Sequence, residues 1–156
     1  MMKLSDPALF REQAYINGRW VDAGSGRCIT VFNPSTNDAI GTVPLMGREE
    51  TQQAIDAANA AWVGWRSKTA RERAAILRRW HDLMLANRED LAILMTAEQG
   101  KPLAESRGEI TYAASFIEWF AEEGKRVYGE VIPAPVAGQR LMTTRMPVGV
   151  CAAITP

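Results

Sequence analysis

The chain has 156 residues, of which 47% are hydrophobic and 23% are charged. These proportions are typical of a globular protein and exclude a disordered or fibrous chain. Eighteen Lys and Arg residues balance eighteen Asp and Glu residues, so no net charge draws the chain toward nucleic acid or anionic lipid. At this length we expect a single domain with no nucleic-acid partner.

The first residues contain no apolar run of the length of a secretory signal, and no stretch approaches the ~20 apolar residues of a membrane span. We therefore expect a cytoplasmic protein without a membrane partner. The two cysteines, Cys28 and Cys151, lie in apolar runs without CxxC spacing and without a neighbouring histidine. This pattern predicts buried, inert thiols in place of a disulfide framework or a metal site.

The opening of the chain is predicted to be a small antiparallel β unit. Apolar residues stand on both sides of Asn17-Gly18, the pair that most readily takes the positive φ angles of a type I′ turn. Two further strands are predicted at 28–32 and 39–43, because both segments are apolar and rich in β-branched residues. The polar residues 33–38 between them are typical of a loop.

Apolar residues that recur three or four positions apart predict an amphipathic helix from Arg48. Two glutamates in its first turn suit the positive end of the helix dipole. The five tryptophans of the chain are Trp20, Trp62, Trp65, Trp80 and Trp119. Four of them fall on predicted helices at core-like spacing and no basic stripe lies between them, so we expect core packing and not a stacking platform for bases.

A second helix is predicted to begin after Thr69. The Thr69 hydroxyl and the Glu72 carboxylate form a capping box, in which each satisfies a backbone N–H that the helix leaves unpaired. The residues of its predicted inward face are Ile76, Trp80, Leu83 and Met84. A third helix is predicted to start at residues 87–90 and to end before Gly100 and Pro102, a pair typical of helix C-termini.

The spacing of apolar residues predicts a long helix over 103–128 that ends at Gly129. Two pairs of glutamates on this helix share a face and could in principle hold a proton or a cation. We interpret both as a solvated helix face; the pairs are Glu105 with Glu109 and Glu118 with Glu122. His81, the only histidine, has no neighbouring Ser or Cys and is assigned a surface or packing role.

Two more strands are predicted near the end of the chain. The first covers about residues 140–146, and the second, 148–154, has the nearly continuous apolar character of a parallel strand buried on both faces. Such a strand needs neighbours joined by crossover helices, which this sequence does not supply, so we expect an incomplete fold. No GxGxxG, P-loop, GxSxG or HExxH motif occurs, and no catalytic or metal-ligating residue is assigned.

The segment 98–105, Glu-Gln-Gly-Lys-Pro-Leu-Ala-Glu, resembles the aldehyde dehydrogenase superfamily, whose members carry an acidic residue, Gly, Lys and Pro between two helices. Further segments that are similar to family signatures, in the family's order, lie at 15–20, 31–34, 54–58 and 147–156. Residues 116–129 resemble in particular the succinate- and glutarate-semialdehyde branch. The resemblance therefore runs through nearly the whole chain.

The resemblance implies an α/β fold, namely the N-terminal part of the aldehyde dehydrogenase fold. That part holds a β-hairpin unit, three to four helices, the start of the oligomerisation strands and the first strand of the Rossmann-like cofactor domain. Residues 1–156 would then be an incomplete N-terminal portion of the NAD(P)-binding domain. The strand at about 140–146 would belong to the sheet through which the full-length protein forms a homo-oligomer.

The resemblance also implies NAD(P)-dependent oxidation of succinate semialdehyde, or a similar semialdehyde, by the full-length protein. Ile154, Thr155 and Pro156 match the family segment that lies along the cofactor, NAD or NADP. The family's nucleophilic cysteine and its general-base glutamate match no residue here, and Cys151 does not match that cysteine. We therefore expect this chain to be inactive alone. The alternative is a non-catalytic helical interaction or scaffold module.

Some family members hold a structural monovalent cation. Its ligands are backbone carbonyls at the positions that match Val31 and Phe32 and a carboxylate at the position that matches Glu98. Many members carry Asp where this chain carries Glu98. The resemblance therefore leaves this cation site open, and we assign no metal ligand to the chain.

Overall fold

The computed structural model describes residues 2–155, which form four α-helices, one short 3-10 helix and six strands. In chain order they are η1 (Pro7–Leu9), β1 (Ala14–Ile16), β2 (Arg19–Val21), β3 (Cys28–Phe32), β4 (Ala39–Pro44), α1 (Arg48–Arg66), α2 (Ala70–Ala86), α3 (Arg88–Gln99), α4 (Leu103–Glu123), β5 (Glu130–Ile132) and β6 (Leu141–Thr143). The described strands pair as three two-stranded antiparallel sheets, β1 with β2, β3 with β4 and β5 with β6. This mixture of helices and small sheets agrees with the expected α/β class. None of the described helices combines the length and the apolar character needed to cross a membrane.

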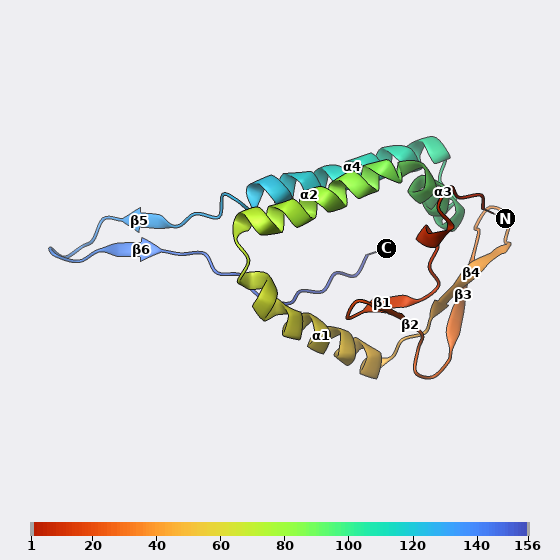
Figure 1. The fold of residues 1–156 in the computed structure, drawn as a ribbon, viewed down its shortest axis with the longest axis horizontal. Helices are drawn as coiled ribbons and strands as arrows, with labels where there is room; N and C mark the ends of the chain where they lie inside the picture. Colours follow the sequence, from red (N-terminus) through yellow and green to blue (C-terminus); the bar gives the residue numbers. More distant parts are fainter. Residues whose placement is uncertain (1, 156) are drawn as a thin grey trace.

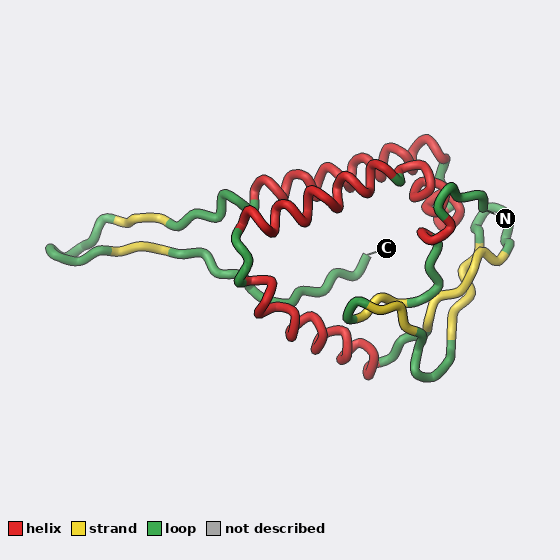
Figure 2. The backbone as a smooth tube through the Cα atoms, viewed as in Figure 1, coloured by secondary structure: helices red, strands yellow, loops and turns green. Residues whose placement is uncertain are grey.

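Three of the helices form one packed group. α2 and α4 lie side by side, and α3 packs against α4 (Figure 1). α1 lies apart from this group, and the β5–β6 hairpin projects beyond the ends of α2 and α4. The segment after β6 turns back into the space between α1 and the α2–α4 pair, as the tube in Figure 2 shows.

The buried core is small and consists mainly of alanine. The buried apolar residues are Ala23, Ala74, Ala92, Ala97, Ile110, Ala114 and Ala121. Small side chains allow helix backbones to approach closely where α4 meets α2 and α3. Ser106, which is fully buried on α4, has its hydroxyl oxygen 2.8 Å from that of Thr96 on α3. This buried polar pair is therefore satisfied within the helix contact.

The predicted turn of the first hairpin is confirmed. Asn17 and Gly18 both have positive φ angles, 51° and 77°, as a type I′ turn requires. Tyr15 and Trp20 face each other across the hairpin with ring centroids 5.1 Å apart, and the Arg11 guanidinium lies 5.1 Å from the Trp20 ring centroid. The β1–β2 hairpin is thus a local unit, stabilised by its own turn and its aromatic pair.

The second predicted pair of strands is confirmed as β3 and β4, with β4 extending to Pro44. Asn33 organises the loop between them. Its side-chain oxygen accepts a hydrogen bond from the N–H of Ser35 at 2.9 Å, and its own N–H donates to the carbonyl oxygen of Asp38 at 2.9 Å. Asn is common in such turns because its side chain can replace a backbone acceptor, which explains the polar loop seen in the sequence.

The helices α1, α2 and α3 begin where the sequence predicts. At the start of α2, Thr69 Oγ1 accepts from the N–H of Glu72 at 3.3 Å, and Glu72 Oε2 accepts from the N–H of Thr69 at 2.7 Å. This is the predicted capping box. α3 ends at Gln99, where Gly100 takes a φ of 78°. A Cβ on Gly100 would lie 2.8 Å from Cγ of Pro34, so glycine also permits contact with the β3–β4 loop.

The prediction that the long helix reaches Tyr128 is wrong, because α4 ends at Glu123. Gly124 makes the last helical backbone hydrogen bond, at 3.0 Å, and the chain then continues into β5. Gly129, expected to end the helix, lies beside the hairpin instead, where a Cβ would overlap the carbonyl oxygen of Thr143. The sequence pattern does not predict β5, because its three residues are all exposed and show no inward-facing apolar period.

The last two predicted strands have different outcomes. The strand expected at about 140–146 is present in shorter form as β6. The buried strand expected at 148–154 is absent, because these residues form no sheet and none of them is buried; Val148 is exposed to 91% and Ile154 to 100%. A parallel strand needs hydrogen-bonding neighbours at its edges, and the described part of the chain places none beside this segment.

Three of the five tryptophans lie at the surface, which contradicts the expected core packing. The exposed ones are Trp20, Trp80 and Trp119, the last to 62%. The prediction for the inward face of α2 is also wrong. Ile76 and Leu83 are exposed, whereas the buried residue of this helix is Ala74. Periodicity identifies an apolar helix face but not the surface that covers it.

Both cysteines are exposed, which contradicts the prediction of buried thiols. Cys28 begins an edge strand of the two-stranded β3–β4 sheet, and Cys151 lies in the unpaired segment after β6. A two-stranded sheet provides little burial by itself, and an unpaired segment provides less. The apolar runs around the two thiols therefore do not produce burial within this chain.

Candidate functional site

The residues predicted to lie along a cofactor are at the end of the described chain. Ile154 and Thr155 are exposed and belong to no helix or strand, in the segment that enters the space between α1 and the α2–α4 pair (Figure 1). Pro156 lies outside the described residues. The candidate site is therefore the segment 147–155, which we call the C-terminal segment.

The C-terminal segment starts against the end of α1. Trp62, Val63, Arg66 and Ser67 line one side of a hollow of about 540 Å³, and residues 146–149 line the other. Beyond this hollow, no backbone hydrogen bond joins residues 150–155 to another described segment. The segment thus shares a hollow with α1 at its beginning and forms no such backbone hydrogen bond along residues 150–155.

The groups that the C-terminal segment offers for binding are mainly its backbone N–H and C=O groups. Its side chains are small or apolar, and its one ionisable group is the Cys151 thiol, whose sulfur lies 3.7 Å from the carbonyl oxygen of Gly149. Backbone N–H and C=O groups must find partners when they are covered. The segment can therefore bind a ligand or a neighbouring strand through main-chain hydrogen bonds, but it supplies no general acid or base.

Three of the four glutamates in the two pairs on α4 form ion pairs with cations, which agrees with the interpretation of a solvated helix face. Glu109 forms an ion pair with Lys101, and Glu122 forms one with Lys125 at 2.9 Å. The hydrogen bond from Lys125 lowers the pKa of Glu122, because it stabilises the charged carboxylate. The ionised form of Glu122 is therefore favoured, which makes this carboxylate poorly suited to share a proton.

His81 takes part in a cluster of charged groups between α2 and α4. Its Nδ1 lies 2.9 Å from Oδ1 of Asp82 on the same helix, and its Nε2 lies 3.9 Å from Oε2 of Glu118 on α4. Arg78 donates to Glu118 at 2.5 Å, and this bond raises the pKa of Arg78. These contacts agree with the surface or packing role assigned to His81.

The Glu-Gln-Gly-Lys-Pro motif forms the turn between α3 and α4. Gly100 ends α3, Lys101 pairs with Glu109 of α4, and Pro102 is the N-cap of α4. Glu98 is exposed, and no group of three or more His, Cys, Asp or Glu side chains within residues 2–155 is placed to hold a metal ion. The motif is thus explained by the geometry of the turn, and the cation site suggested by resemblance stays a prediction.

One buried carboxylate, that of Asp90, is not predicted by the sequence. Asp90 is only 4% exposed and accepts hydrogen bonds from the backbone N–H groups of Ser5 at 2.9 Å and Asp6 at 2.8 Å. These bonds lower the pKa of Asp90. In the sequence Asp90 reads as an ordinary acidic residue in the first turn of a helix, so no pattern points to partners more than eighty residues away.

Comparison with known proteins shows the family to which the chain belongs. Residues 20–156 match the sequence profile of the aldehyde dehydrogenase family. The chain belongs to this family. The matched region includes the turn motif at residues 98–102 and the C-terminal segment, so the resemblance seen in the sequence is confirmed over most of its length.

Two bacterial semialdehyde dehydrogenases are each 61% identical to this aldehyde dehydrogenase chain. They are the NADP(+)-dependent succinate-semialdehyde dehydrogenase of Escherichia coli and the glutarate-semialdehyde dehydrogenase of Pseudomonas putida, matched over 99% of this chain and 32% of their own. The crystal structure of succinate-semialdehyde dehydrogenase from Burkholderia pseudomallei, 61% identical, superposes with a TM-score of 0.93 over 95% of this chain and 31% of its own. The chain thus spans about a third of the length of the curated relatives it matches.

Proposed function

We propose that the protein containing this chain oxidises succinate semialdehyde, or a similar semialdehyde, to the carboxylate with NAD(P)+. The observation that carries the proposal is the 61% identity, over 99% of the chain, to enzymes named for succinate and glutarate semialdehyde. Both substrates are short aldehydes that carry a carboxylate at the other end. We infer that the substrate here has the same two groups, an aldehyde that reacts and a carboxylate that the protein recognises.

We also propose that residues 1–156 are the N-terminal portion of the NAD(P)-binding domain and that Ile154, Thr155 and Pro156 lie along the cofactor. The fit is supported by Ile154 and Thr155, which are exposed in a segment whose backbone groups are free to bind a nucleotide. Bound NAD(P)+ would accept the hydride that leaves the aldehyde carbon. The C-terminal segment would contribute binding and orientation only, because it carries no acid or base.

The assembly of the whole protein is proposed to be a homo-oligomer in the cytoplasm. The β5–β6 hairpin supports the first part of this proposal, because it projects from the helices and exposes apolar residues, Val131 to 86%. A strand edge that is exposed in this way can pair with an edge of another chain. The strand near 140–146 would then belong to an intersubunit sheet.

A substrate panel tests the proposed activity. The whole protein is assayed for NADPH and NADH formation with succinate semialdehyde, glutarate semialdehyde and butyraldehyde, which lacks the distal carboxylate. We expect a higher kcat/KM for the two semialdehydes than for butyraldehyde. Turnover of all three at equal kcat/KM would refute the substrate class, and no turnover with any aldehyde would favour the alternative of a non-catalytic scaffold module.

A further inference from the structure

The N-terminal segment of the chain joins two parts of the fold that the regular elements leave separate. We call residues 2–12 the N-terminal strap. At one end Asp90 of α3 accepts hydrogen bonds from the N–H groups of Ser5 and Asp6, at 2.9 and 2.8 Å. These bonds are charge-assisted, because the acceptor is a carboxylate, and such bonds are stronger than those between neutral groups. Asp90 thus fastens the strap to the helical part.

The other end of the strap is fastened to β4. Glu12 Oε1 accepts a hydrogen bond from the N–H of Thr42 at 2.7 Å and lies 3.3 Å from the Thr42 hydroxyl. Next to this contact the ring of Phe10 passes directly over Gly41, where a Cβ would lie 2.6 Å from Cζ of Phe10. The strap therefore connects α3 to β4 through two carboxylates, one from α3 and one of its own.

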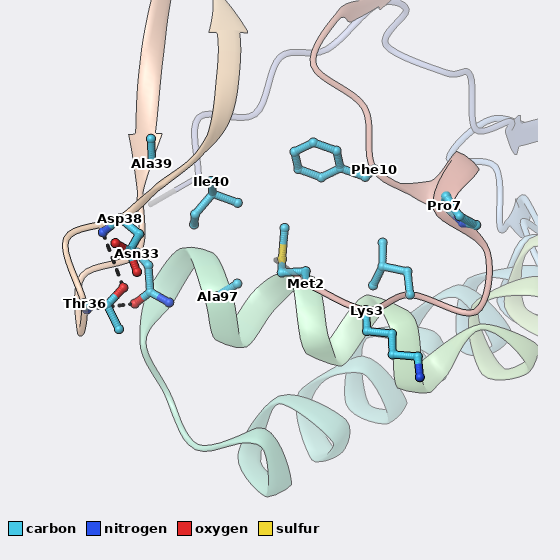
Figure 3. A pocket seen from close by; sticks show the side chains of 11 residues that line it. Met2, Lys3, Pro7, Phe10, Asn33, Thr36, Asp38, Ala39, Ile40 and Ala97 are labelled. Carbon is cyan, nitrogen blue, oxygen red and sulfur yellow. Dashed lines mark hydrogen bonds between the residues drawn. The ribbon is translucent and has the colours of Figure 1, made fainter.

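The strap lines a hollow of about 870 Å³ with residues on both sides of its attachment to Asp90 (Figure 3). The strap residues that line it are Met2, Lys3, Leu4, Pro7 and Phe10. Ile40 of β4 and Ala97 of α3 line it from the other sides. Polar residues of the β3–β4 loop stand at one end, namely Asn33, Thr36 and Asp38. In the close view the ends of Met2, Phe10 and Ile40 point toward one another, so the lining is mainly apolar.

Apart from the hydrogen bonds of the two carboxylates, little holds the strap in place, because its apolar side chains are poorly buried. No residue from 2 to 12 is buried; Met2, Leu4 and Phe10 are half-buried and the residues around the Asp90 contact are exposed. The helices are held together independently, because α4 packs directly against α2 and α3. Segments with few buried contacts open locally at a much lower free energy than the core. The contacts of Asp90 are therefore the main barrier to opening at the α3 end.

We propose that the N-terminal strap is a releasable cover, which Asp90 holds over the apolar hollow between β4 and α3. Release of Ser5 and Asp6 from Asp90 uncovers Ile40 and Ala97 while the packed helices stay folded. The Glu12 attachment keeps the strap tethered to β4, so the cover swings away from α3 and remains part of the fold.

The test compares two neighbouring carboxylate-to-amide variants in the whole protein. Asp90→Asn replaces one of the two oxygens that hold the strap by an NH2 group, which cannot accept a hydrogen bond, whereas Glu89→Gln is the matched control, because the hydrogen bonds of the Glu89 side chain go to Arg107. Hydrogen exchange is followed by mass spectrometry in peptides that cover 3–9 and 110–120. We expect Asp90→Asn to reduce protection in the strap peptide by about tenfold, with the α4 peptide unchanged. Equal strap protection in both variants would overturn the proposal.

A second measurement on the unmodified protein keeps the proposal testable if Asp90→Asn does not fold. Exchange in the two peptides is measured in increasing urea below the unfolding transition. A cover that opens locally exposes little surface, so its protection stays nearly constant while that of α4 falls. Parallel loss of protection in both peptides would show that the strap opens only when the whole fold unfolds, and would also overturn the proposal.

Discussion

The carboxylate of Glu50, in the first turn of α1, accepts hydrogen bonds from the N–H of Gly47 at 2.8 Å and from the N–H of Gly24 at 2.9 Å. The first bond caps α1, and the second attaches the turn after β2 to the start of this helix. The backbone bond from Gly47 is the largest cause of a lowered pKa at Glu50, and the bond from Gly24 adds to it. One side chain therefore links the small β unit to the helices through its charge.

The lowered pKa of Glu50 predicts an acid-sensitive attachment. Because the folded-state pKa lies below the unfolded value, the stabilisation is complete above the unfolded pKa and is lost as the pH falls through the folded pKa. We expect exchange protection at Gly24, corrected for intrinsic rates, to fall over that acidic range. Glu50→Gln should remove this pH dependence, whereas Glu49→Gln, one residue away, should keep it. A pH profile that is the same in both variants contradicts the prediction.

Thr69 is predicted to stabilise the start of α2 through its hydroxyl. Thr69→Ala removes the acceptor for the N–H of Glu72, and loss of such a cap costs about 1 kcal/mol. Thr69→Ser keeps the acceptor and should stay close to the original stability. Hydrogen exchange in the peptide 70–76 reports the difference, which should appear as faster exchange for the alanine variant alone. Equal exchange in both variants would show that the capping box contributes nothing.

Gly129 is predicted to be essential for the β5–β6 hairpin. Gly129→Ala places a Cβ where it overlaps the carbonyl oxygen of Thr143, so the hairpin must open or shift. Gly108→Ala is the control, because a Cβ at this position on α4 meets no atom within 4 Å and alanine favours a helix by about 1 kcal/mol. If the hairpin joins subunits, Gly129→Ala alone should lower the mass of the oligomer in light scattering. An unchanged mass would show that the hairpin is not needed for assembly of the oligomer.

Local rules predict much of this fold, because the signals they use are contained in a few adjacent residues. Asn17-Gly18 specifies its turn through positive φ angles, and the Thr69 and Glu72 capping box specifies a helix start, whatever surrounds them. The family resemblance in addition predicts the known fold to which the chain belongs. None of these signals depends on which surface lies opposite a given side chain.

Features that depend on distant partners are not predicted. Trp119 and Ile154 are apolar and yet exposed, because burial depends on a covering surface that the described chain does not provide. Asp90, by contrast, is charged and yet buried. Its carboxylate oxygens accept hydrogen bonds from the N–H groups of Ser5 and Asp6. The candidate cofactor segment follows from resemblance alone, since its residues carry no chemical group that identifies a ligand.

The most direct measurement is the rate of NAD+ and NADP+ reduction with succinate or glutarate semialdehyde, determined for the whole protein and for the 156-residue chain at equal molar concentration. The account predicts steady formation of NADH or NADPH by the whole protein and none above the blank by the chain, whose C-terminal segment supplies main-chain groups but no acid or base. Reduction of either cofactor by the isolated chain would contradict the account, and so would the absence of any reduction by the whole protein.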